Sequence, residues 1–334
     1  MFMKVAVIGS GAWGTALAIR LCKNGHDVCL WTFEKDLIPQ MENERVNIRL
    51  PQARLPEGLQ ISGDYACAAG CQMVVIASPS FPLRSVCRGV APYIDKNAIV
   101  VSVAKGIENG TQLRMSQVVE QETGHKVVVL TGPSHAEEVA LDLPTACLAA
   151  CDIREMAEFV QDAFMSDAFR IYTSPDAVGA ELGAALKNVI ALCAGVSDGL
   201  GYGDNTKAML MTRGLTEIAR LGVAMGAKKE TFAGLAGVGD LIVTCTSMHS
   251  RNRRAGILIG QGKTPEEAMK EVGAVVEGYY AAQSAWELCC KQGVDMPIVH
   301  AAYSVLYEGI SAAQVVETLL HRSKKAESED AGWL

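Results

Sequence analysis

One lysine in the middle of the chain stands where an amine can do chemistry. Lys187 lies in a run of small and apolar residues from Asp176 to Asp198, and no other side chain between Glu181 and Asp198 is formally charged. A lysine in such a run either extends its alkyl stem to reach water or holds its amine in a polar cleft against a ligand. In the second case the amine can exchange a proton with a reacting group. This stretch alone leaves both roles open.

The spacing of the apolar residues predicts that this run is a core helix. At 3.6 residues per turn, the face that carries Lys187 consists of small residues, so another segment or a ligand can approach it closely. These residues are Ala180, Gly183, Ala184, Ala191 and Ala194. Glu181, Lys187 and Asn188 interrupt the run well short of the roughly 20 apolar residues that a bilayer needs. We therefore expect no membrane insertion.

A group of polar residues in the later half of the chain can bind an anion. Arg251, Arg253 and Arg254 stand within four positions, beside Ser250 and Asn252. Either Ser250 caps a solvated helix, which accounts for Arg253 and Arg254, or the group holds a phosphate with a guanidinium, a hydroxyl, an amide and helix N–H groups. Because the net charge is −7, any anion must be held locally in this way. The same acidity argues against a nucleic-acid partner.

The chain begins with the pattern of a dinucleotide-binding turn. The apolar run from Lys4 to Ile8 predicts a strand, a glycine-rich turn follows, and a helical pattern continues to Leu21. The first glycine permits the turn, the second lets the backbone approach a pyrophosphate, and the third lets helix and strand pack closely. The turn consists of Gly9, Ser10, Gly11, Ala12, Trp13 and Gly14. We expect a dinucleotide there; the alternative is a glycine-rich turn that binds nothing.

The residues just past the second predicted strand, Asp27 to Trp31, select between NAD and NADP. Glu34 can accept a hydrogen bond from a ribose hydroxyl, whereas its carboxylate would repel a 2′-phosphate, and no arginine stands beside it. Phe33 can lie against the adenine ring. These residues favour NAD over NADP; the alternative is that both are ordinary strand-end residues.

Further apolar runs alternate with helical or turn segments, which is the pattern of a doubly wound parallel sheet. The predicted strands are Met73 to Ala77, Ala98 to Val103, Val127 to Leu130 and Thr145 to Ala150. After about Asp176 the pattern is helical to the end. We predict an α/β fold with a Rossmann-like dinucleotide-binding domain over residues 1–175, an all-α substrate and catalytic domain over 176–322, and a flexible charged tail over 323–334.

Polar residues at the ends of predicted strands are candidates for ligand contacts, because ligands of such sheets sit beyond the carboxyl ends of the strands. Three places stand out: Ser78 to Phe81, Lys105 with Gly106, and Gly132 to Ala136, which includes Ser134. Lys105 directly follows a buried strand, so it is better placed to meet a ligand than a random surface lysine.

Composition sets the class of protein. The 334 residues are 49% hydrophobic and 20% charged, which suits a soluble enzyme of about two domains. The eleven cysteines form no CxxC pair and no cluster with histidine, so we expect reduced thiols and no metal site. The first residues lack the pattern of a secretory peptide, and we expect a cytoplasmic protein.

Taken together, these residues resemble the family of NAD(P)-dependent glycerol-3-phosphate dehydrogenases, from about Lys4 to about Leu320. The matching motifs are Gly9-x-Gly11-x-Trp13-Gly14, Leu50-Pro51, Lys105-Gly106-Ile-Glu108, Gly132-Pro-Ser134-x-Ala136, Leu186-Lys187-Asn188, Gly237-x-Gly-Asp240-Leu, Ser250-Arg251-Asn252 and Val275-Val-Glu277-Gly278. One motif alone would be weak evidence, but eight in order are specific. The resemblance implies that the protein interconverts dihydroxyacetone phosphate and sn-glycerol 3-phosphate with NAD or NADP, and that it feeds glycerophospholipid synthesis.

The resemblance also implies roles for single residues. Lys187 is expected to be the catalytic acid/base, with Lys105, Asn188, Asp240 and Thr244 around the reacting carbons. Implied substrate contacts are Lys105, Gly132, Ser134, Lys187, Asp240, Ser250, Arg251 and Asn252. Implied cofactor contacts are Trp13 of the glycine turn and, outside that turn, Lys105, Ala136, Arg251, Val275 and Glu277. Burial and Lys105 would lower the pKa of Lys187 from its usual value of about 10.4, and Asp240 would oppose them.

The sequence departs from the family pattern at two places. The strand end with Phe33 and Glu34 looks like that of NAD-using eukaryotic members, and Arg49 stands where an aromatic residue is usual. Two alternatives share much of the layout: a β-hydroxyacid or 6-phosphogluconate-type dehydrogenase, and a non-catalytic dinucleotide-sensing protein in which Lys187 faces solvent. The apolar helical half leads us to expect a homodimer.

Overall fold

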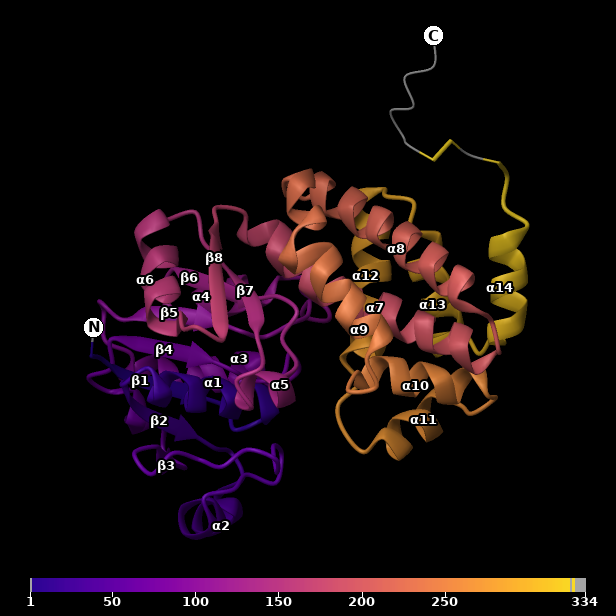
Figure 1. Ribbon diagram of the computed structural model, residues 1–334. Coiled ribbons are helices and arrows are strands. Elements are labelled where there is room, and N and C mark those ends of the chain that lie inside the picture. Colours follow the sequence, from indigo (N-terminus) through magenta and orange to yellow (C-terminus); the bar gives the residue numbers. More distant parts are fainter. Residues whose placement is uncertain (1, 325, 328–334) are drawn as a thin grey trace.

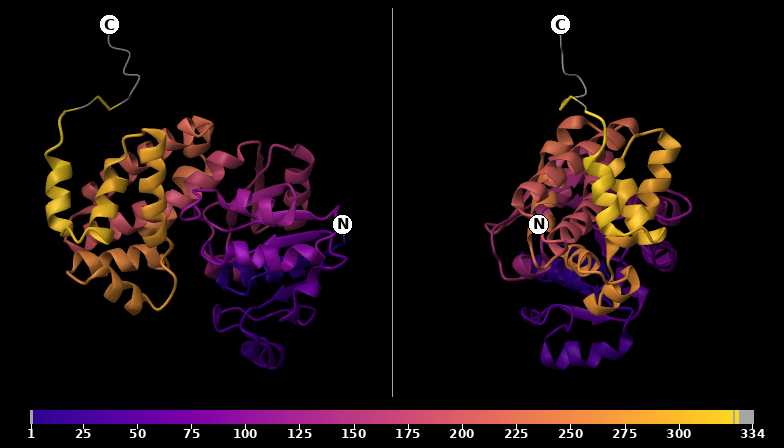
Figure 2. Two further views of the ribbon diagram at one scale, coloured as in Figure 1. Left: turned by 180° about the vertical axis from the view of Figure 1, so that it is seen from behind. Right: turned by 90° about the vertical axis from the view of Figure 1, so that its right-hand side faces the viewer.

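The computed structural model describes residues 2–324 and 326–327, so the tail expected over 323–334 falls largely outside the described residues. Figure 1 shows an α/β part, coloured indigo to magenta, beside a helical part, coloured orange to yellow. Helix α7 (Ala177–Gly199) extends from the junction of the two parts into the helical part. The view from behind in Figure 2 shows the same two parts side by side.

In the described residues the sheet has eight strands in the order β3-β2-β1-β4-β5-β6-β7-β8. The strands are β1 (Lys4–Ile8), β2 (Asp27–Trp31), β3 (Gln60–Ser62), β4 (Met73–Ile76), β5 (Ile99–Ser102), β6 (Val127–Thr131), β7 (Thr145–Ala150) and β8 (Phe169–Ser174). All pairs from β3 to β6 are parallel. The strand order reverses between β1 and β4, and such a reversal opens a crevice for ligands at the carboxyl ends of the strands.

The last two strands depart from the predicted parallel pattern. β7 pairs with β6 in the antiparallel direction, so the expectation that Thr145 to Ala150 continues the parallel sheet is wrong. The reason lies in the connection over residues 132–144: a parallel strand needs a crossover that returns along the whole sheet, usually through a long helix, and this one contains only the five-residue helix α5 (Ala136–Ala140). β8 then pairs parallel with β7. Neither β8 nor the three-residue β3 was predicted.

Helices cover both faces of the sheet (Figures 1 and 2). One apolar core packs the sheet against α1 (Ala12–Lys23), α5 and α6 (Arg154–Phe164). A second core packs the opposite face against α3 (Leu83–Val90) and α4 (Met115–Thr123). The short helix α2 (Ile38–Glu44) lies beyond the edge strand β3. This two-sided burial explains why the central strands are apolar throughout instead of alternating.

The helical part packs around α7. Its other helices are α8 (Asp204–Ala224), α9 (Asp240–Thr246), α10 (Arg251–Gly260), α11 (Pro265–Val272), α12 (Glu277–Gln292), α13 (Pro297–Tyr307) and α14 (Ala312–Leu320). The small residues of α7 let backbone approach backbone: a Cβ at Gly183 would overlap the carbonyl oxygen of Ala236, and one at Gly195 would overlap that of Arg253. These contacts bring the turn before α9 and the start of α10 onto α7. They place the polar residues of both segments beside Lys187 and Asn188.

Helix α7 is long and apolar enough to cross a membrane by length and composition, but 83% of its apolar window is buried inside the protein. Asp176 caps its first turn, because Oδ1 accepts a hydrogen bond of 2.9 Å from the backbone nitrogen of Gly179. The prediction that this run forms a core helix is confirmed.

Candidate active site

The glycine turn after β1 has the shape that a pyrophosphate requires. Gly9 has a φ of +130°, and a Cβ at Gly14 would overlap the carbonyl oxygen of Gly9. At Gly11, in contrast, a Cβ would meet no atom within 4 Å, so the backbone there is open to a ligand. Gly11 directly precedes α1, whose N-terminal N–H groups and dipole favour an anion. The residues present therefore fit a dinucleotide.

The turn is tied to the end of β2 by buried hydroxyl groups. Ser10 Oγ donates to Thr32 Oγ1 at 2.7 Å, and the backbone nitrogen of Glu34 donates to the same oxygen at 3.2 Å. Phe33 is 82% exposed, so its ring is accessible to an adenine. Phe33 and Glu34 thus lie next to the glycine turn, at the carboxyl end of the neighbouring strand.

The surroundings of Glu34 differ from the prediction. Arg49 Nη2 lies 2.5 Å from Glu34 Oε1, so the prediction that no arginine stands beside Glu34 is wrong. The two residues are 15 positions apart, and the chain between them returns to the end of β2. Local sequence around Glu34 therefore could not reveal its partner.

Lys187 is buried in the junction, and its amine contacts a carboxylate and a hydroxyl. The residue is 5% exposed. Nζ donates to Oδ1 of Asp240 and, at 2.7 Å, to Oγ1 of Thr244. Lys105 Nζ donates to the second oxygen of Asp240 at 2.8 Å and to the carbonyl oxygen of Gly132 at 3.3 Å. One carboxylate therefore joins an amine of the helical part to an amine of the sheet part.

The start of α9 sets the positions of Asp240 and Thr244. The preceding turn, Leu235–Gly239, contains Gly237 at φ −103° and ψ −105°, and it packs against the small face of α7. Thr244 lies one helical turn after Asp240, and its hydroxyl donates to the Asp240 carbonyl at 2.6 Å. Because that proton is engaged, a lone pair of the hydroxyl accepts from Lys187. Asp240 is 1% exposed, so its charge acts with little screening by water.

The environment of Lys187 shifts its titration into the neutral range. Burial lowers the pKa of Lys187 to about 7, the Asp240 carboxylate acts to raise it, and the Lys105 amine lowers it further. A lysine with this pKa exists as ammonium and as amine in similar amounts near pH 7. It can therefore act as an acid in one direction of a reaction and as a base in the other.

Asn188 connects Lys187 to the arginine-rich segment. Its Oδ1 accepts from Asn252 Nδ2 at 3.0 Å, and Asn252 Oδ1 accepts from the backbone nitrogen of Gly278 at 2.8 Å. Ser250 caps α10, because its Oγ accepts from the backbone nitrogen of Arg253 at 3.2 Å. Ser250, Arg251 and Asn252 thus stand at a helix N-terminus held against α7.

Two of the arginines of this segment, Arg251 and Arg253, have different surroundings. Arg253 binds Asp198 through Nε and Nη2 at 2.9 and 2.8 Å, so it joins α10 to the end of α7. Arg251 is exposed at the first position of α10 and lies close enough to Glu277 to lower the pKa of that carboxyl, against the dominant effect of burial, which raises it. Of these two, Arg251 is the one positioned for a ligand.

Glu277 spans the junction between the two parts of the protein. Its Oε2 accepts from Ser80 Oγ at 2.6 Å. Ser80 follows β4, in a segment that the sequence marked as a strand-end candidate, but it was not among the predicted site residues. Val275, two residues before Glu277, is 42% exposed. Ser80 is therefore a further candidate residue of the site. Its position just after a strand is the sequence feature that could have identified it.

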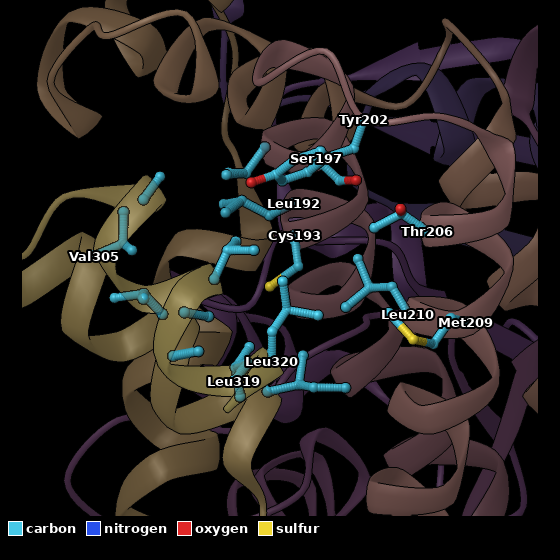
Figure 3. Close-up of a pocket in the computed structure, with 17 residues that line it drawn as sticks. Leu192, Cys193, Ser197, Tyr202, Thr206, Met209, Leu210, Val305, Leu319 and Leu320 are labelled. Atoms are coloured by element: carbon cyan, nitrogen blue, oxygen red, sulfur yellow. The ribbon is translucent and has the colours of Figure 1, made fainter. Parts of the chain in front are cut away.

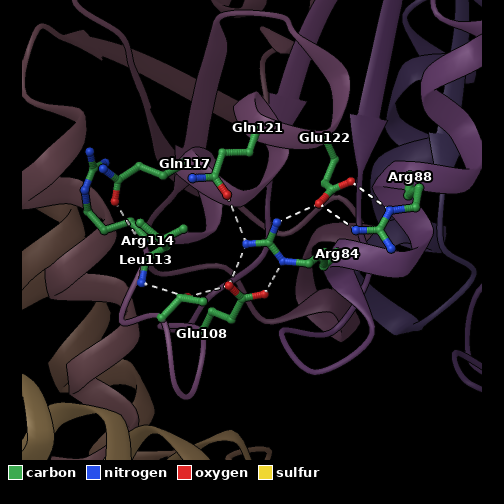
Figure 4. Close-up of polar contacts among 9 residues, drawn as sticks. Arg84, Arg88, Glu108, Leu113, Arg114, Gln117, Gln121 and Glu122 are labelled. Atoms are coloured by element: carbon green, nitrogen blue, oxygen red, sulfur yellow. Dashed lines mark hydrogen bonds and ion pairs between the residues drawn. The ribbon is translucent and has the colours of Figure 1, made fainter.

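The loop that carries Lys105 is held by a network of ion pairs (Figure 4). Arg84 on α3 donates to both carboxylate oxygens of Glu108, at 2.8 and 2.7 Å, and to Oε1 of Glu122 at 2.6 Å. Arg88 donates to Oε2 of Glu122 at 3.0 Å. Glu108 lies three residues after Lys105, so this bidentate pair fixes the loop on the sheet part.

The segment after β6 completes the sheet side of the junction. Ser134 Oγ donates to the Gly132 carbonyl oxygen at 3.1 Å, the same oxygen that Lys105 contacts, and Ala136 is buried at the start of α5. His135, which was not predicted as a site residue, lies 5.6 Å from His249 between ring centroids. Burial lowers the pKa of His135, and the positive charge of Lys187 lowers it further.

A cavity lies elsewhere in the helical part, away from Lys187 (Figure 3). It is a cavity of about 150 Å³ among α7, α8, α13 and α14, lined mainly by apolar side chains such as Leu192, Val196, Leu210 and Val305. At 100° per residue, Val196 lies on the opposite side of α7 from Lys187. No lining residue carries a charge, so this cavity does not suit a phosphorylated substrate.

The predicted residues form two linked groups. Lys105, Gly132, Lys187, Asp240 and Thr244 are joined by direct hydrogen bonds, and Asn188 and Asn252 form a second bonded pair beside them. The glycine turn and Glu34 lie at the carboxyl ends of β1 and β2 and belong to neither group. A Rossmann-type sheet beside a buried lysine and carboxylate defines a nicotinamide-dinucleotide-dependent dehydrogenase.

Comparisons with known proteins identify the family within that class. Two family models, the N-terminus and the C-terminus of NAD-dependent glycerol-3-phosphate dehydrogenase, match residues 4–157 and 176–317. The chain belongs to this family and is an NAD(P)-dependent oxidoreductase with glycerol-3-phosphate dehydrogenase activity.

Relatives and solved structures agree along the whole chain. A glycerol-3-phosphate dehydrogenase [NAD(P)+] of Clostridium perfringens is 53% identical, over 97% of this chain and 99% of its own length. The crystal structure of the glycerol-3-phosphate dehydrogenase from Coxiella burnetii has a TM-score of 0.92 at 38% identity and covers 96% of this chain and 99% of that one. A structure of the Saccharomyces cerevisiae enzyme has a TM-score of 0.82 at 28% identity, with 96% and 99% covered. The predicted family and fold class are confirmed.

Proposed function

We propose that Lys187 is the acid/base in the interconversion of dihydroxyacetone phosphate and sn-glycerol 3-phosphate. The observation that carries this assignment is the buried Asp240 carboxylate, which holds the amines of Lys187 and Lys105 from the two parts of the protein. A dinucleotide-sensing protein without turnover would not require a buried lysine and a partly exposed one to share a buried carboxylate, because burying such charges is costly. The reaction supplies glycerol 3-phosphate for glycerophospholipid synthesis.

In the reducing direction, the Lys187 ammonium donates a hydrogen bond to the C2 carbonyl oxygen and transfers its proton as the alkoxide forms. In the oxidising direction the neutral amine removes the proton of the C2 hydroxyl. Asp240 and Thr244 orient the amine, and Lys105 and Asn188 lie beside the reacting carbons. When bound, the nicotinamide ring supplies or accepts the hydride.

The substrate phosphate binds at the start of α10. Ser250, Arg251 and Asn252 provide a hydroxyl, a guanidinium and an amide at a helix N-terminus, which match the oxygens of a phosphate. Gly132 and Ser134 border the substrate on the sheet side. Because the phosphate does not react, its binding energy acts by positioning C2 next to the acid/base.

The dinucleotide is held at the carboxyl ends of the strands. The residues that would hold it are Gly9, Ser10, Gly11, Ala12, Trp13, Gly14, Phe33, Glu34, Lys105, Ala136, Arg251, Val275 and Glu277. The indole Nε1 of Trp13, a residue of the glycine turn, is buried and has no hydrogen-bond partner within the described residues. The Ser80–Glu277 contact closes the sheet part onto the helical part around this site.

The pH dependence of the two directions should differ in sign. Because the pKa of Lys187 is lowered to about 7, the amine required for oxidation increases as pH rises through neutrality, and the ammonium required for reduction decreases. We expect kcat for oxidation to rise, and kcat for reduction to fall, between about pH 6 and pH 8. Initial rates at saturating substrate, followed by NAD(P)H absorbance, measure both. Flat profiles in both directions would contradict the assignment.

Replacing Arg251 by alanine should mainly weaken substrate binding. Charge-assisted hydrogen bonds to a phosphate are lost, so we expect KM for dihydroxyacetone phosphate to rise by about 10- to 100-fold with a smaller change in kcat. Steady-state kinetics measure this split. Unphosphorylated dihydroxyacetone is the matched control, because its slow reduction should be nearly equal in the variant and the native enzyme. Equal losses with both substrates would show that Arg251 does not bind the phosphate.

Three further features are proposals. We place the domain boundary between β8 and α7, near residue 175, and we propose a cytoplasmic enzyme. We also propose a homodimer that associates through the helical part, because apolar side chains such as Met209, Val223 and Leu320 are 49%, 49% and 63% exposed there. Light scattering during gel filtration measures the mass; a monomer at micromolar concentration would contradict the dimer.

A further inference from the structure

Arg49 and Glu34 form an ion pair at the open end of β2, beside the glycine turn. Their side chains are 48% and 41% exposed, and one guanidinium nitrogen lies 2.5 Å from a carboxylate oxygen. An exposed pair of this kind contributes little to stability, so it opens easily when a ligand offers either group a better partner. The two side chains are therefore available to bind.

The backbones that carry the pair are held much more firmly than the side chains. The backbone nitrogen of Arg49 donates to Asn47 Oδ1 at 2.9 Å. The Asn47 amide, 1% exposed, donates to the carbonyl oxygen of Ser10 and to Thr15 Oγ1, both at 2.8 Å. A buried asparagine thus ties the segment of Arg49 directly to the dinucleotide-binding turn.

Glu34 is tied to the same turn from the other side. Its backbone nitrogen donates to Thr32 Oγ1 at 3.2 Å, and that oxygen accepts from Ser10 Oγ at 2.7 Å. Ser10 is therefore the common anchor for both members of the pair. An acidic residue at this distance from the glycine turn faces the adenosine ribose of a bound dinucleotide. Arg49 must face the same part of the ligand, since it touches Glu34.

We infer that Arg49 binds the 2′-phosphate of NADP and that the Arg49–Glu34 pair sets the cofactor preference. With NAD, Glu34 accepts from the ribose 2′-hydroxyl while remaining paired with Arg49. With NADP, Arg49 turns its planar fork to the phosphate, and Glu34 turns to water. A carboxylate alone would exclude NADP, whereas the pair admits both cofactors. This inference rests on the proposed placement of the dinucleotide at the glycine turn.

Calorimetric binding of NADP+ and NAD+ to the full-length protein tests the assignment without turnover. In Arg49→Ala the affinity for NADP+ should fall by about 10- to 100-fold and that for NAD+ by less than about threefold. In Glu34→Gln the repulsion disappears, so NADP+ should bind more tightly and NAD+ more weakly. Arg54→Ala removes an exposed arginine of the same loop and should leave both affinities unchanged. Thermal unfolding checks that each variant is folded.

The outcomes separate the inference from the proposed function. If Arg49→Ala binds both cofactors as the native protein does, or loses affinity for both equally, Arg49 does not select between them. Either result overturns this inference without contradicting the proposed dinucleotide site of the native protein. A native protein that binds neither cofactor overturns the dinucleotide site and this inference with it. Binding of adenosine 2′,5′-bisphosphate, compared with adenosine 5′-phosphate, should follow the same pattern as the whole cofactors.

Discussion

Replacing Lys187 by alanine is expected to lower kcat in both directions by about 10²- to 10⁴-fold, the range that a positioned general acid/base contributes. Lys105 binds the second oxygen of Asp240 from the sheet part, so we do not expect its amine to take over the proton transfer at the position of Lys187 Nζ. The affinity for NAD(P) should remain, because the glycine turn and the end of β2 do not depend on this side chain. Steady-state kinetics and calorimetric cofactor binding measure the two effects.

Alanine at position 187 also removes a buried alkyl stem, so the loss of activity must be separated from a loss of folding. Lys187→Met keeps most of the volume and removes the amine; it should be as inactive as alanine but nearly as stable as the native enzyme. Lys263→Ala, a surface change near the end of α10, is the matched control and should retain full activity. Near-native kcat in Lys187→Met would end the acid/base assignment.

Replacing Asp240 by asparagine should damage activity and stability together. The change leaves two amines facing a neutral amide in a buried site, and removing one partner of a buried ion pair typically costs about 3–5 kcal/mol. Because Asp240 acts to raise the pKa of Lys187, which is about 7 in the native protein, that pKa should be lower in the variant. Less ammonium is then present at neutral pH, so the rate of reduction should fall more than the rate of oxidation. The ammonium fraction, and with it the rate of reduction, should fall about tenfold for each unit by which the pKa of Lys187 lies below the pH.

The control for Asp240→Asn is another carboxylate that bridges two cations. Asp142 is 40% exposed and pairs with the buried guanidinium of Arg20 and with the exposed amine of Lys23. Asp142→Asn should lower the free energy of unfolding less than Asp240→Asn does, because water screens the half-exposed Asp142 carboxylate, and it should leave the kinetics unchanged. Chemical denaturation and pH–rate profiles of both variants measure this contrast. Similar effects of the two substitutions would contradict a special role for the buried carboxylate.

Much of the fold follows from local patterns. The glycine turn after Ile8 and the apolar run around Lys187 each contain their own geometric signal, a Gly-specific turn in one case and a small-residue helix face in the other. The direction of β7 could not be predicted this way, because strand residues read the same in either orientation and only the short α5 connection decides. Likewise β3 and β8 lie at the sheet edge, where the apolar signal is weak.

The family motifs allowed single site residues to be predicted, but the hydrogen bonds and ion pairs among those residues could not be predicted from the sequence. That Asp240 holds two lysines depends on Gly183, which lets the turn before α9 pack onto α7. The Arg49–Glu34 pair depends on Asn47, which fastens a loop to the glycine turn. Ser80 pairs with Glu277 across 197 positions of sequence. Such contacts arise from the packing of segments that are distant in the sequence, so the spacing of residues along the chain does not predict them.

The most direct test is a crystal structure of the protein with NAD+ and dihydroxyacetone phosphate bound together. We expect Lys187 Nζ within hydrogen-bonding distance, about 3 Å, of the C2 oxygen, with the phosphate on Arg251 and the nicotinamide on the other side of C2. A substrate whose phosphate lies away from α10, or whose C2 oxygen contacts a group other than Lys187, would contradict the proposed mechanism.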